Sequence, residues 1–307
     1  MAAAADAFVS SLAADEAVRA AQANVDRLQT FAEAVGTLVR NELRPGADAS
    51  RADAELAIAR NQVSQSKQTA AVARALLAET IGAAGTPPTL EPGVLTQLPP
   101  AAAGDLPPID THPAIRARVA AVESVQAHER ALARSYAPRI EVQSAFSGRG
   151  SGAEVPGQPL RSDGLRLDVP NWAAGVTVTF PVLDGFAIGA RKRAEMQNEI
   201  AERARQAQAV QSVATERLRA QALLSAATDI AGNTPAELAA ARDAESRARA
   251  RYASGLASIT EVADAQRVLT QAETDDAVAR LGVWRALLAM AQAGGDLTPF
   301  VDRLHRP

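Results

Sequence analysis

Apolar and small residues recur at helical spacing through the first quarter of the chain. Between residues 18 and 39, and again between residues 52 and 77, the steps between them alternate between three and four positions, as in the heptad repeat of a coiled coil. The two seams are Val18, Ala21, Val25, Leu28, Ala32, Val35 and Val39, and then Ala52, Leu56, Ala59, Val63, Ser66, Ala70, Ala73 and Leu77. Pro45 and Gly46 break the pattern between them, which predicts an antiparallel pair of helices joined by a turn.

The apolar period changes to two in the middle of the chain. In PRIEVQSAF, Ile140, Val142 and Phe146 alternate with polar or small residues, and NWAAGVTVTFP alternates in the same way from Trp172 to Phe180. Each run has about the 9–11 residues that a tilted strand needs to cross a bilayer. An apolar face beside a polar face is typical of a membrane barrel wall, but it also fits a hairpin half buried on a soluble core. Alternation alone leaves both interpretations open.

Proline, glycine and a return of the helical period set the other boundaries. The expected division is a first helical hairpin over 1–86, a Pro/Gly-rich extended linker over 87–110, helices over 111–136 and 182–307, and a β-hairpin with its loop over 137–181. Asp110 or Thr111 is the expected N-cap of the helix that follows the linker. The segment from Asn233 to Pro235 predicts a kink or an interruption in the long helix after the hairpin.

Composition narrows the possible functions. The net charge of −3 gives no electrostatic footprint for nucleic acid, and the absence of cysteine excludes disulfides and thiolate metal sites. Aromatic residues make up only 3% of the chain, which favours closely approaching helices over a large aromatic core. The three histidines are scattered, and we find no catalytic, cofactor-binding or metal-binding motif. We therefore expect a protein that is not an enzyme and carries no cofactor.

One stretch, RYASGLASITEVADAQ from Arg251 to Gln266, joins two helical patterns by a turn. A loose copy, LRPGADASRADAELAIAR, begins at Leu43. Each copy places a capping-box pattern after a glycine-containing turn: Ser50-x-x-Asp53 in the first copy and Ser258-x-x-Glu261 in the second. The chain therefore contains two related helix–turn–helix units, of which the second is the fuller.

The order Tyr252, Gly255, Ser258, Glu261 and Asp264 resembles the hairpin-tip motif of the TolC-like outer-membrane efflux proteins. The stretches HPAIRARV, RSYAPRIEV and GVTVTFPVLDGFAIGARKRAE, in that order, resemble the second half of the same family. The resemblance implies a mainly α fold, in which long antiparallel coiled-coil helices belong to an α-barrel. It also implies that one β-hairpin of the chain contributes to an outer-membrane β-barrel, and that the protein is a homotrimer.

The same resemblance implies a function. The expected protein is a passive exit duct of a tripartite efflux or type I secretion system in a Gram-negative outer membrane, with a periplasmic extension. Its expected partners are a periplasmic adaptor protein, an inner-membrane transporter and outer-membrane lipid, with no nucleic acid. A periplasmic adaptor and a coiled-coil scaffold without channel activity are the alternatives. An adaptor would carry two lipoyl half-motifs flanking one hairpin, whereas this chain has two hairpins.

The chain departs from the family pattern at its start. Its first repeat lacks a counterpart of residues 111–185, and MAAAADAFVSSLAADE has no positively charged segment of a signal peptide. We therefore expect an N-terminally truncated family member, a mis-assigned start or a fragment of the complete protein.

The resemblance assigns roles to residues at the tips. Glu261 and Asp264 share a helix face and match the acidic positions that line the pore constriction in the family, where three copies would form carboxylate rings. Acids in a first helical turn also stabilise the helix dipole, which explains Glu261 better than Asp264. Tyr252 matches a closing contact of the tip, with Asp53 as its candidate hydrogen-bond partner, although packing across the turn would also account for it.

Further residues receive roles from their place in the pattern. The turns around Gly46, Ser50, Gly255 and Ser258 are the expected contacts for the adaptor. Trp172 fits the aromatic belt of a membrane interface, or ordinary packing equally well, and Trp284 is expected in a helical core. The loop between Gly148 and Pro170 would face the cell exterior.

Overall fold

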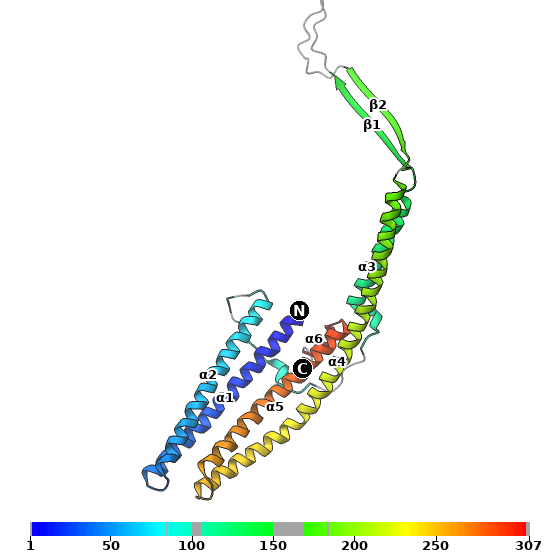
Figure 1. Ribbon diagram of the computed structural model, residues 1–307. Coiled ribbons are helices and arrows are strands. Elements are labelled where there is room, and N and C mark those ends of the chain that lie inside the picture. Colours follow the sequence, from blue (N-terminus) through cyan, green and yellow to red (C-terminus); the bar gives the residue numbers. More distant parts are fainter. Residues whose placement is uncertain are drawn as a thin grey trace, which may run out of the picture. The chain divides into compact units, whose positions relative to one another are not determined.

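The structure is a computed structural model that describes residues 2–83, 85–86, 88–99, 106–149, 169–182 and 184–304 (Figure 1). Its elements are α1 (Ala2–Arg40), α2 (Gly46–Thr80), the short 3-10 helices η1 (Gly93–Thr96) and η2 (Ile109–Thr111), α3 (Pro113–Arg134), β1 (Arg139–Arg149), β2 (Val169–Thr179), α4 (Gly185–Ala253), α5 (Ile259–Gly294) and α6 (Thr298–Leu304). The expected mainly α fold with one β-hairpin is confirmed. The chain forms two compact units: residues 1–113 with 210–307, and residues 114–209.

Helices α1 and α2 form an antiparallel pair in the first unit, along the seam that the heptad pattern predicts (Figure 1). One cluster of buried residues consists of Ala21, Val25, Leu28, Leu56, Ala59 and Val63, all of which belong to the predicted seams. Near the turn the seam departs from the prediction, because Phe31 is buried and Ala32 only partly so. Phe31 takes the buried position because its ring packs against Tyr252 in this cluster, whereas a methyl group would not reach.

Helix α5 packs against α1 and forms the main core of this unit. That core includes Val9, Leu12, Leu281, Trp284, Leu288 and Phe300. Trp284 is buried as expected, and its indole Nε1 donates a hydrogen bond to the backbone oxygen of Gln97 at 2.9 Å. Leu95 in η1 is also buried in this core. The described part of the expected extended linker therefore packs on the helices.

Helix α4 contains 69 residues and runs through Pro235 without interruption, so the predicted interruption is wrong, and the predicted kink stays a prediction. Proline removes one helical hydrogen bond. Beside it, the buried Thr234 hydroxyl donates to Asp276 Oδ1 on α5 at 3.3 Å, and Ala231 is buried in the core against α5. These contacts with α5 hold the helix through the proline. The following helix, α5, ends at Gly294, and Gly295 after it adopts the left-handed conformation at a φ of 80°.

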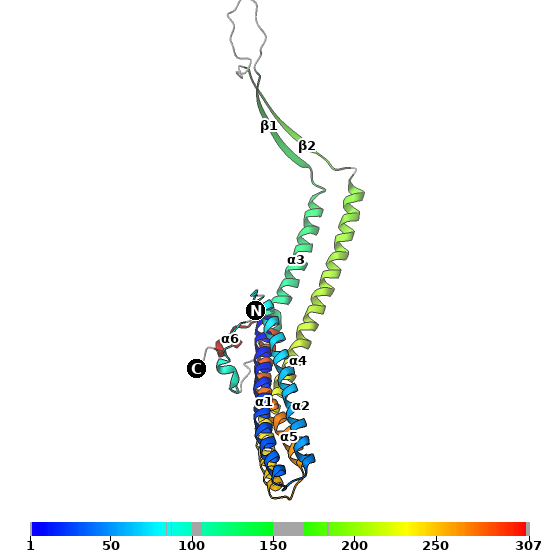
Figure 2. The same ribbon diagram turned by 90° about the vertical axis from the view of Figure 1, so that its left-hand side faces the viewer.

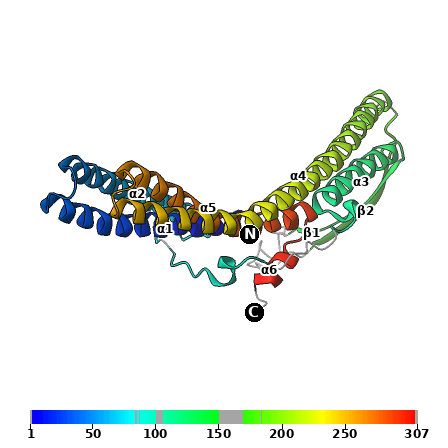
Figure 3. The same cartoon turned by 90° about the horizontal axis from the view of Figure 1, so that it is seen from below.

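The second unit contains α3 beside the first part of α4 (Figures 2 and 3). Polar contacts join the two helices: Gln126 Nε2 donates to Glu199 Oε1 at 2.8 Å, and Lys192 lies 3.9 Å from Glu129. Helix α3 begins at Pro113, so the residue before it is His112. The expected cap at Asp110 or Thr111 is therefore wrong, because both residues belong to the short helix η2.

Strands β1 and β2 pair in antiparallel register, with Val142 opposite Val176 and Phe146 opposite Trp172. The pairing carries the apolar positions of both strands onto one face of the two-stranded sheet. Val142 and Trp172 are 78% and 79% exposed, so this face packs against nothing else in the chain that the structure describes. The strands reach Arg149 and Val169, and the expected exterior loop between them lies outside the described residues.

We expect Leu288→Ala to reduce the free energy of unfolding by about 2–5 kcal/mol, because it removes a fully buried side chain and leaves a cavity. Chemical denaturation followed by helical circular dichroism measures this loss. Leu256→Ala is the matched control, because Leu256 is 71% exposed in the turn after α4. Equal losses in the two variants would contradict the assignment of the core.

Candidate functional site at the helix tips

The two helical turns of the first unit differ in how they reverse the chain. Between α4 and α5, Gly255 adopts a φ of 82°, a conformation that glycine reaches without strain. Between α1 and α2 the left-handed residue is Glu42, with a φ of 59°, and Gly46 is the first residue of a helix. The expectation that Gly46 allows the first turn is therefore wrong, since the reversal is complete before it.

The two predicted capping boxes also differ. Ser258 Oγ accepts from Glu261 N and Glu261 Oε1 accepts from Ser258 N, both at 3.3 Å, so the second box is confirmed. The first box is wrong: α2 begins at Gly46 after Pro45, whose side chain makes no cap, and Ser50 lies inside the helix. Proline restricts the residue before it and suits the start of a helix, so the helix begins earlier than the serine.

Tyr252 connects the two turns. Its side chain is only 2% exposed, and its ring meets Phe31 of α1 edge-on at a centroid distance of 5.4 Å. The guanidinium carbon of Arg44 lies 4.4 Å from the centre of the same ring, within the range of a cation–π contact. Arg44 Nη2 also donates to the backbone oxygen of Tyr252. The residue is therefore held on its ring and on its backbone by the α1–α2 hairpin.

The hydroxyl of Tyr252 donates a hydrogen bond to Asp48 Oδ2 at 2.9 Å. The expected partner, Asp53, is exposed and takes no part in this contact. The reason is the early start of α2: the two acids are five positions apart within one helix, so their side chains leave it about 140° apart. The prediction of a tyrosine–acid contact between the hairpins is therefore right in kind and wrong in the acid.

Burial raises the pKa of Tyr252 to about 12, and the hydrogen bond to Asp48 and the negative charge of its carboxylate act in the same direction. The positive charge of Arg44 opposes them. The protonated phenol is thus the form that the packed turns favour. Folding raises the pKa of Tyr252, so the protonated phenol stabilises the folded state. This contribution to the free energy of unfolding is complete below about pH 10 and is lost as the pH rises through 12.

Glu261 and Asp264 lie on the exposed side of α5, away from the buried Val262 and Ala263. Arg251 Nη2 is 3.9 Å from Glu261 Oε2, and Arg267 Nη2 is 3.1 Å from Asp264 Oδ1. Glu261 also closes the capping box, so its helix-capping role is confirmed. Their role as carboxylate rings remains a prediction, and so does the membrane-interface role of the exposed Trp172.

Three residues of the tip are missing from the sequence prediction: Phe31, Arg44 and Asp48. Only Asp48 carried a usable signal, because an acid three residues after Pro45 belongs in the first turn of a helix that begins at the proline. Phe31 and Arg44 reach Tyr252 from a part of the chain about 200 residues away, and no local pattern marks such a contact.

Within the described residue ranges, no cluster of three or more histidine, cysteine or acidic side chains is placed to hold a metal ion. None of the helices in the same ranges combines the length and apolar character needed to cross a bilayer.

We expect tyrosine absorbance to reveal a step near pH 12 that Tyr252→Phe removes. Asp48→Asn should move this step downward, because it keeps a hydrogen-bond acceptor and deletes the carboxylate charge. The chain has one other tyrosine, so Tyr136→Phe is the control and should leave the upper step in place. An ultraviolet titration of the three variants checks this. If the Tyr252 titration stayed at the same pH in Asp48→Asn, the carboxylate of Asp48 would not contribute to the raised pKa.

The comparisons with known proteins agree with the fold. Residues 109–296 match the family described as outer membrane efflux protein, whereas the comparison with curated proteins gives no match. The structure is similar to that of CusC, described for conformational changes accompanying folding and transmembrane channel formation, with a TM-score of 0.78 and 17% identity over 94% of this chain and 66% of that chain.

Two further channels are similar. The outer-membrane channel OprN gives a TM-score of 0.75 with 21% identity, covering 96% of this chain and 65% of that one. The Campylobacter jejuni CmeC outer membrane channel gives 0.76 with 12% identity, covering 96% and 62%. The chain thus spans about two thirds of the length of these channels, and at such identities the likeness shows the fold. Since the family match covers more than half of the sequence, the chain belongs to the outer membrane efflux protein family.

Proposed function

We propose that this chain belongs to a passive exit duct in the outer membrane of a tripartite efflux or type I secretion system. The observation that carries the proposal is the β-hairpin, which has one apolar and exposed face. Membership of the outer membrane efflux protein family and the likeness to outer-membrane channels support it. None of these similarities favours a periplasmic adaptor.

The two faces of the hairpin differ as the wall of a membrane barrel requires. One face carries Ile140, Val142, Phe146, Trp172, Val176 and Val178, and the other carries Arg139, Glu141, Gln143, Thr177 and Thr179. Each strand has 11 residues, enough to cross the hydrocarbon layer when tilted. The apolar face would then meet lipid and the polar face the lumen. Trp172 would lie at the membrane interface.

A two-stranded sheet leaves one edge of each strand without backbone partners. In hydrocarbon these edges must be closed by further strands, because unpaired backbone groups there cost several kcal/mol each. We propose that copies of the chain supply the strands around a common axis, with the homotrimer as the assembly that the family resemblance implies. The long helices would then extend the duct into the periplasm as an α-barrel.

At the other end, the tips would control the opening. The ring of Glu261 and Asp264 side chains from several copies would form an acidic constriction that favours cations. The contacts of Tyr252 with Arg44, Phe31 and Asp48 would hold the two hairpins of each copy together in the closed arrangement.

The partners follow from this arrangement. The start of α2 at Gly46–Ser50 and the turn at Gly255–Ser258 are the surfaces that we assign to a periplasmic adaptor. An inner-membrane transporter would supply the energy, because the chain itself carries no motif for nucleotide binding.

The hairpin assignment predicts opposite outcomes for neighbouring residues. We expect Val176→Arg to abolish outer-membrane assembly, because an arginine on the lipid face costs about 2–4 kcal/mol at mid-membrane depth. Thr177→Arg, on the opposite face one residue on, should assemble as the wild type does. Membrane fractionation of the complete protein with native gel electrophoresis measures the outcome. Equal assembly of both variants would contradict the assignment of the Val176 side of the hairpin to lipid.

The tip assignment predicts an electrical phenotype. We expect Glu261→Gln with Asp264→Asn to shift the reversal potential under a salt gradient toward zero, because the acids that favour cations are neutralised. Glutamine keeps the capping box, so the helix start is preserved. The measurement is conductance of the complete protein in planar bilayers.

The matched control for this experiment is Glu216→Gln with Asp229→Asn, which removes two exposed acids of α4 away from the tip. It should leave the reversal potential unchanged. If both double variants shifted the potential alike, overall charge would explain the selectivity and the constriction would lie elsewhere.

A further inference from the structure

Basic residues gather where the β-hairpin joins the helices of the second unit. Residues 130–139 and 180–193 contain a single acid, Asp184, and six bases: Arg130, Arg134, Arg139, Arg191, Lys192 and Arg193. The chain as a whole has a net charge of −3, so this positive charge is a local feature. A local excess of one sign favours a partner of the opposite charge.

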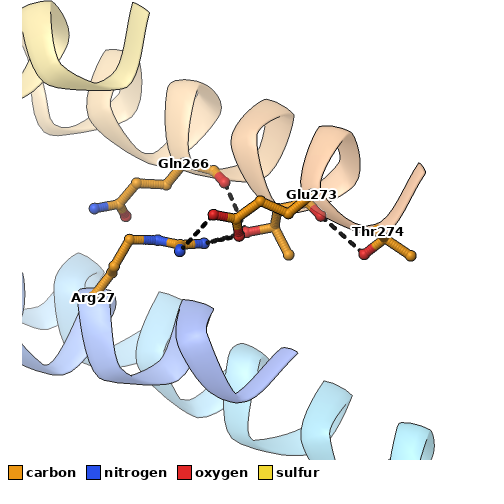
Figure 4. Close-up of polar contacts among 5 residues, drawn as sticks. Arg27, Gln266, Glu273 and Thr274 are labelled. Carbon is orange, nitrogen blue, oxygen red and sulfur yellow. Dashed lines mark hydrogen bonds and ion pairs between the residues drawn. The ribbon is translucent and has the colours of Figure 1, made fainter. Parts of the chain in front are cut away.

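Many arginines elsewhere in the chain are neutralised by an acid. Arg27, for example, donates from Nη1 and Nη2 to the carboxylate of Glu273 at 3.1 and 2.9 Å (Figure 4). At the junction, Lys192 lies 3.9 Å from Glu129. Among the residues that the structure describes, the other five bases of the junction form no ion pair, and all five are exposed. Their charges are therefore available to a partner outside the chain.

Arg139 begins β1 on the polar face of the hairpin, so it would face the lumen. The remaining four arginines belong to the adjoining helices, and we call them the basic collar: Arg130, Arg134, Arg191 and Arg193.

Exposed aromatic side chains lie between the strands and the basic collar. On the way to β1, Arg134 in the last turn of α3 is followed by Tyr136, and after β2 Phe180 and Phe186 precede Arg191. The three aromatic residues are 49%, 64% and 95% exposed, in chain order. Both connections thus pass from apolar strand through aromatic residues to arginine. A bilayer surface has the matching order of hydrocarbon, interface and charged headgroups.

The basic collar lies near the level at which the strands end. Helix α3 ends at Arg134 and α4 begins at Gly185, so at 1.5 Å per residue the four arginines lie within about 12 Å of the helix ends beside the hairpin. Arg130 and Arg191 lie at one level, because their sequence neighbours form the ion pair described above. Long basic side chains reach toward a membrane interface from such positions.

A phosphate group suits arginine, because the guanidinium fork can donate two parallel hydrogen bonds to its oxygens. A zwitterionic phospholipid also carries a phosphate, but its ammonium group repels a neighbouring arginine. A headgroup with a net negative charge lacks this repulsion. We propose that the basic collar binds the headgroups of anionic phospholipids in the leaflet that faces the periplasm.

This inference rests on the proposed function, because that function places the hairpin in the outer membrane. The bound headgroups would fix the depth of the chain in the bilayer. The arginines would resist entry into the hydrocarbon, and the exposed aromatic residues would resist withdrawal from the interface.

Lipid retention by the complete protein tests the proposal. The protein is reconstituted into vesicles of phosphatidylglycerol and phosphatidylcholine in equal amounts and is then extracted in detergent. Mass spectrometry quantifies the phospholipids that stay bound. We expect bound phosphatidylglycerol to exceed bound phosphatidylcholine at least about fivefold, the factor that corresponds to one arginine close to an anionic surface.

The test variant replaces all four arginines of the basic collar by glutamine and should bring this ratio close to one. The matched control replaces four other exposed arginines of the same two helices by glutamine: Arg116, Arg118, Arg203 and Arg205. These lie at least about 24 Å along the helices from the ends beside the hairpin, several Debye lengths away. The control removes the same number of arginines and should leave the ratio unchanged.

Resistance to carbonate extraction from the vesicles reports insertion separately, and helical circular dichroism verifies that each variant is folded. A wild type that does not insert would overturn the proposed function and this inference together. A wild type that inserts and retains both lipids equally would overturn the inference alone. Equal losses of phosphatidylglycerol in the test and control variants would also overturn it, because the overall charge of the helices would then explain the retention.

Discussion

Close approach of helices through small side chains is the constraint on which the first unit depends. Alanine occupies many of the buried positions along α1, α2 and α5, and each contributes little apolar area by itself. Stability therefore comes from the length of the seams, since a long helix repeats the same contact every turn or two. The larger side chains gather at two places, the core around Trp284 and the cluster around Tyr252, and these fix the registers of the seams.

Tyr252 has a particular position in this scheme because it lies at the end of α4 and is enclosed by residues of α1, α2 and the turn between them. Ring packing on Phe31, the guanidinium of Arg44 and the hydrogen bond to Asp48 use three different properties of one side chain. Such a combination tolerates few substitutions. Phenylalanine would keep the first two contacts, and histidine or leucine would keep at most one.

The sequence predicted regular features well and long-range features poorly. The heptad seams, the alternating strands and the capping box at Ser258 follow from short-range rules, and each is observed. The predicted capping box at Ser50 is absent because α2 already begins at Gly46, directly after Pro45. The same early start explains why Asp48 contacts Tyr252, although the sequence pattern favoured Asp53.

The register of the β-hairpin has a consequence for how the chain matures. Side chains alternate between faces, so a slip of either strand by one residue would turn Glu141 and Gln143, or Thr177 and Thr179, toward the side that Val142 and Val176 now share. A bilayer rejects such a surface, whereas water accepts both alignments almost equally. Entry into a bilayer would thus select for register, because only copies with correctly aligned strands present a wholly apolar face to lipid.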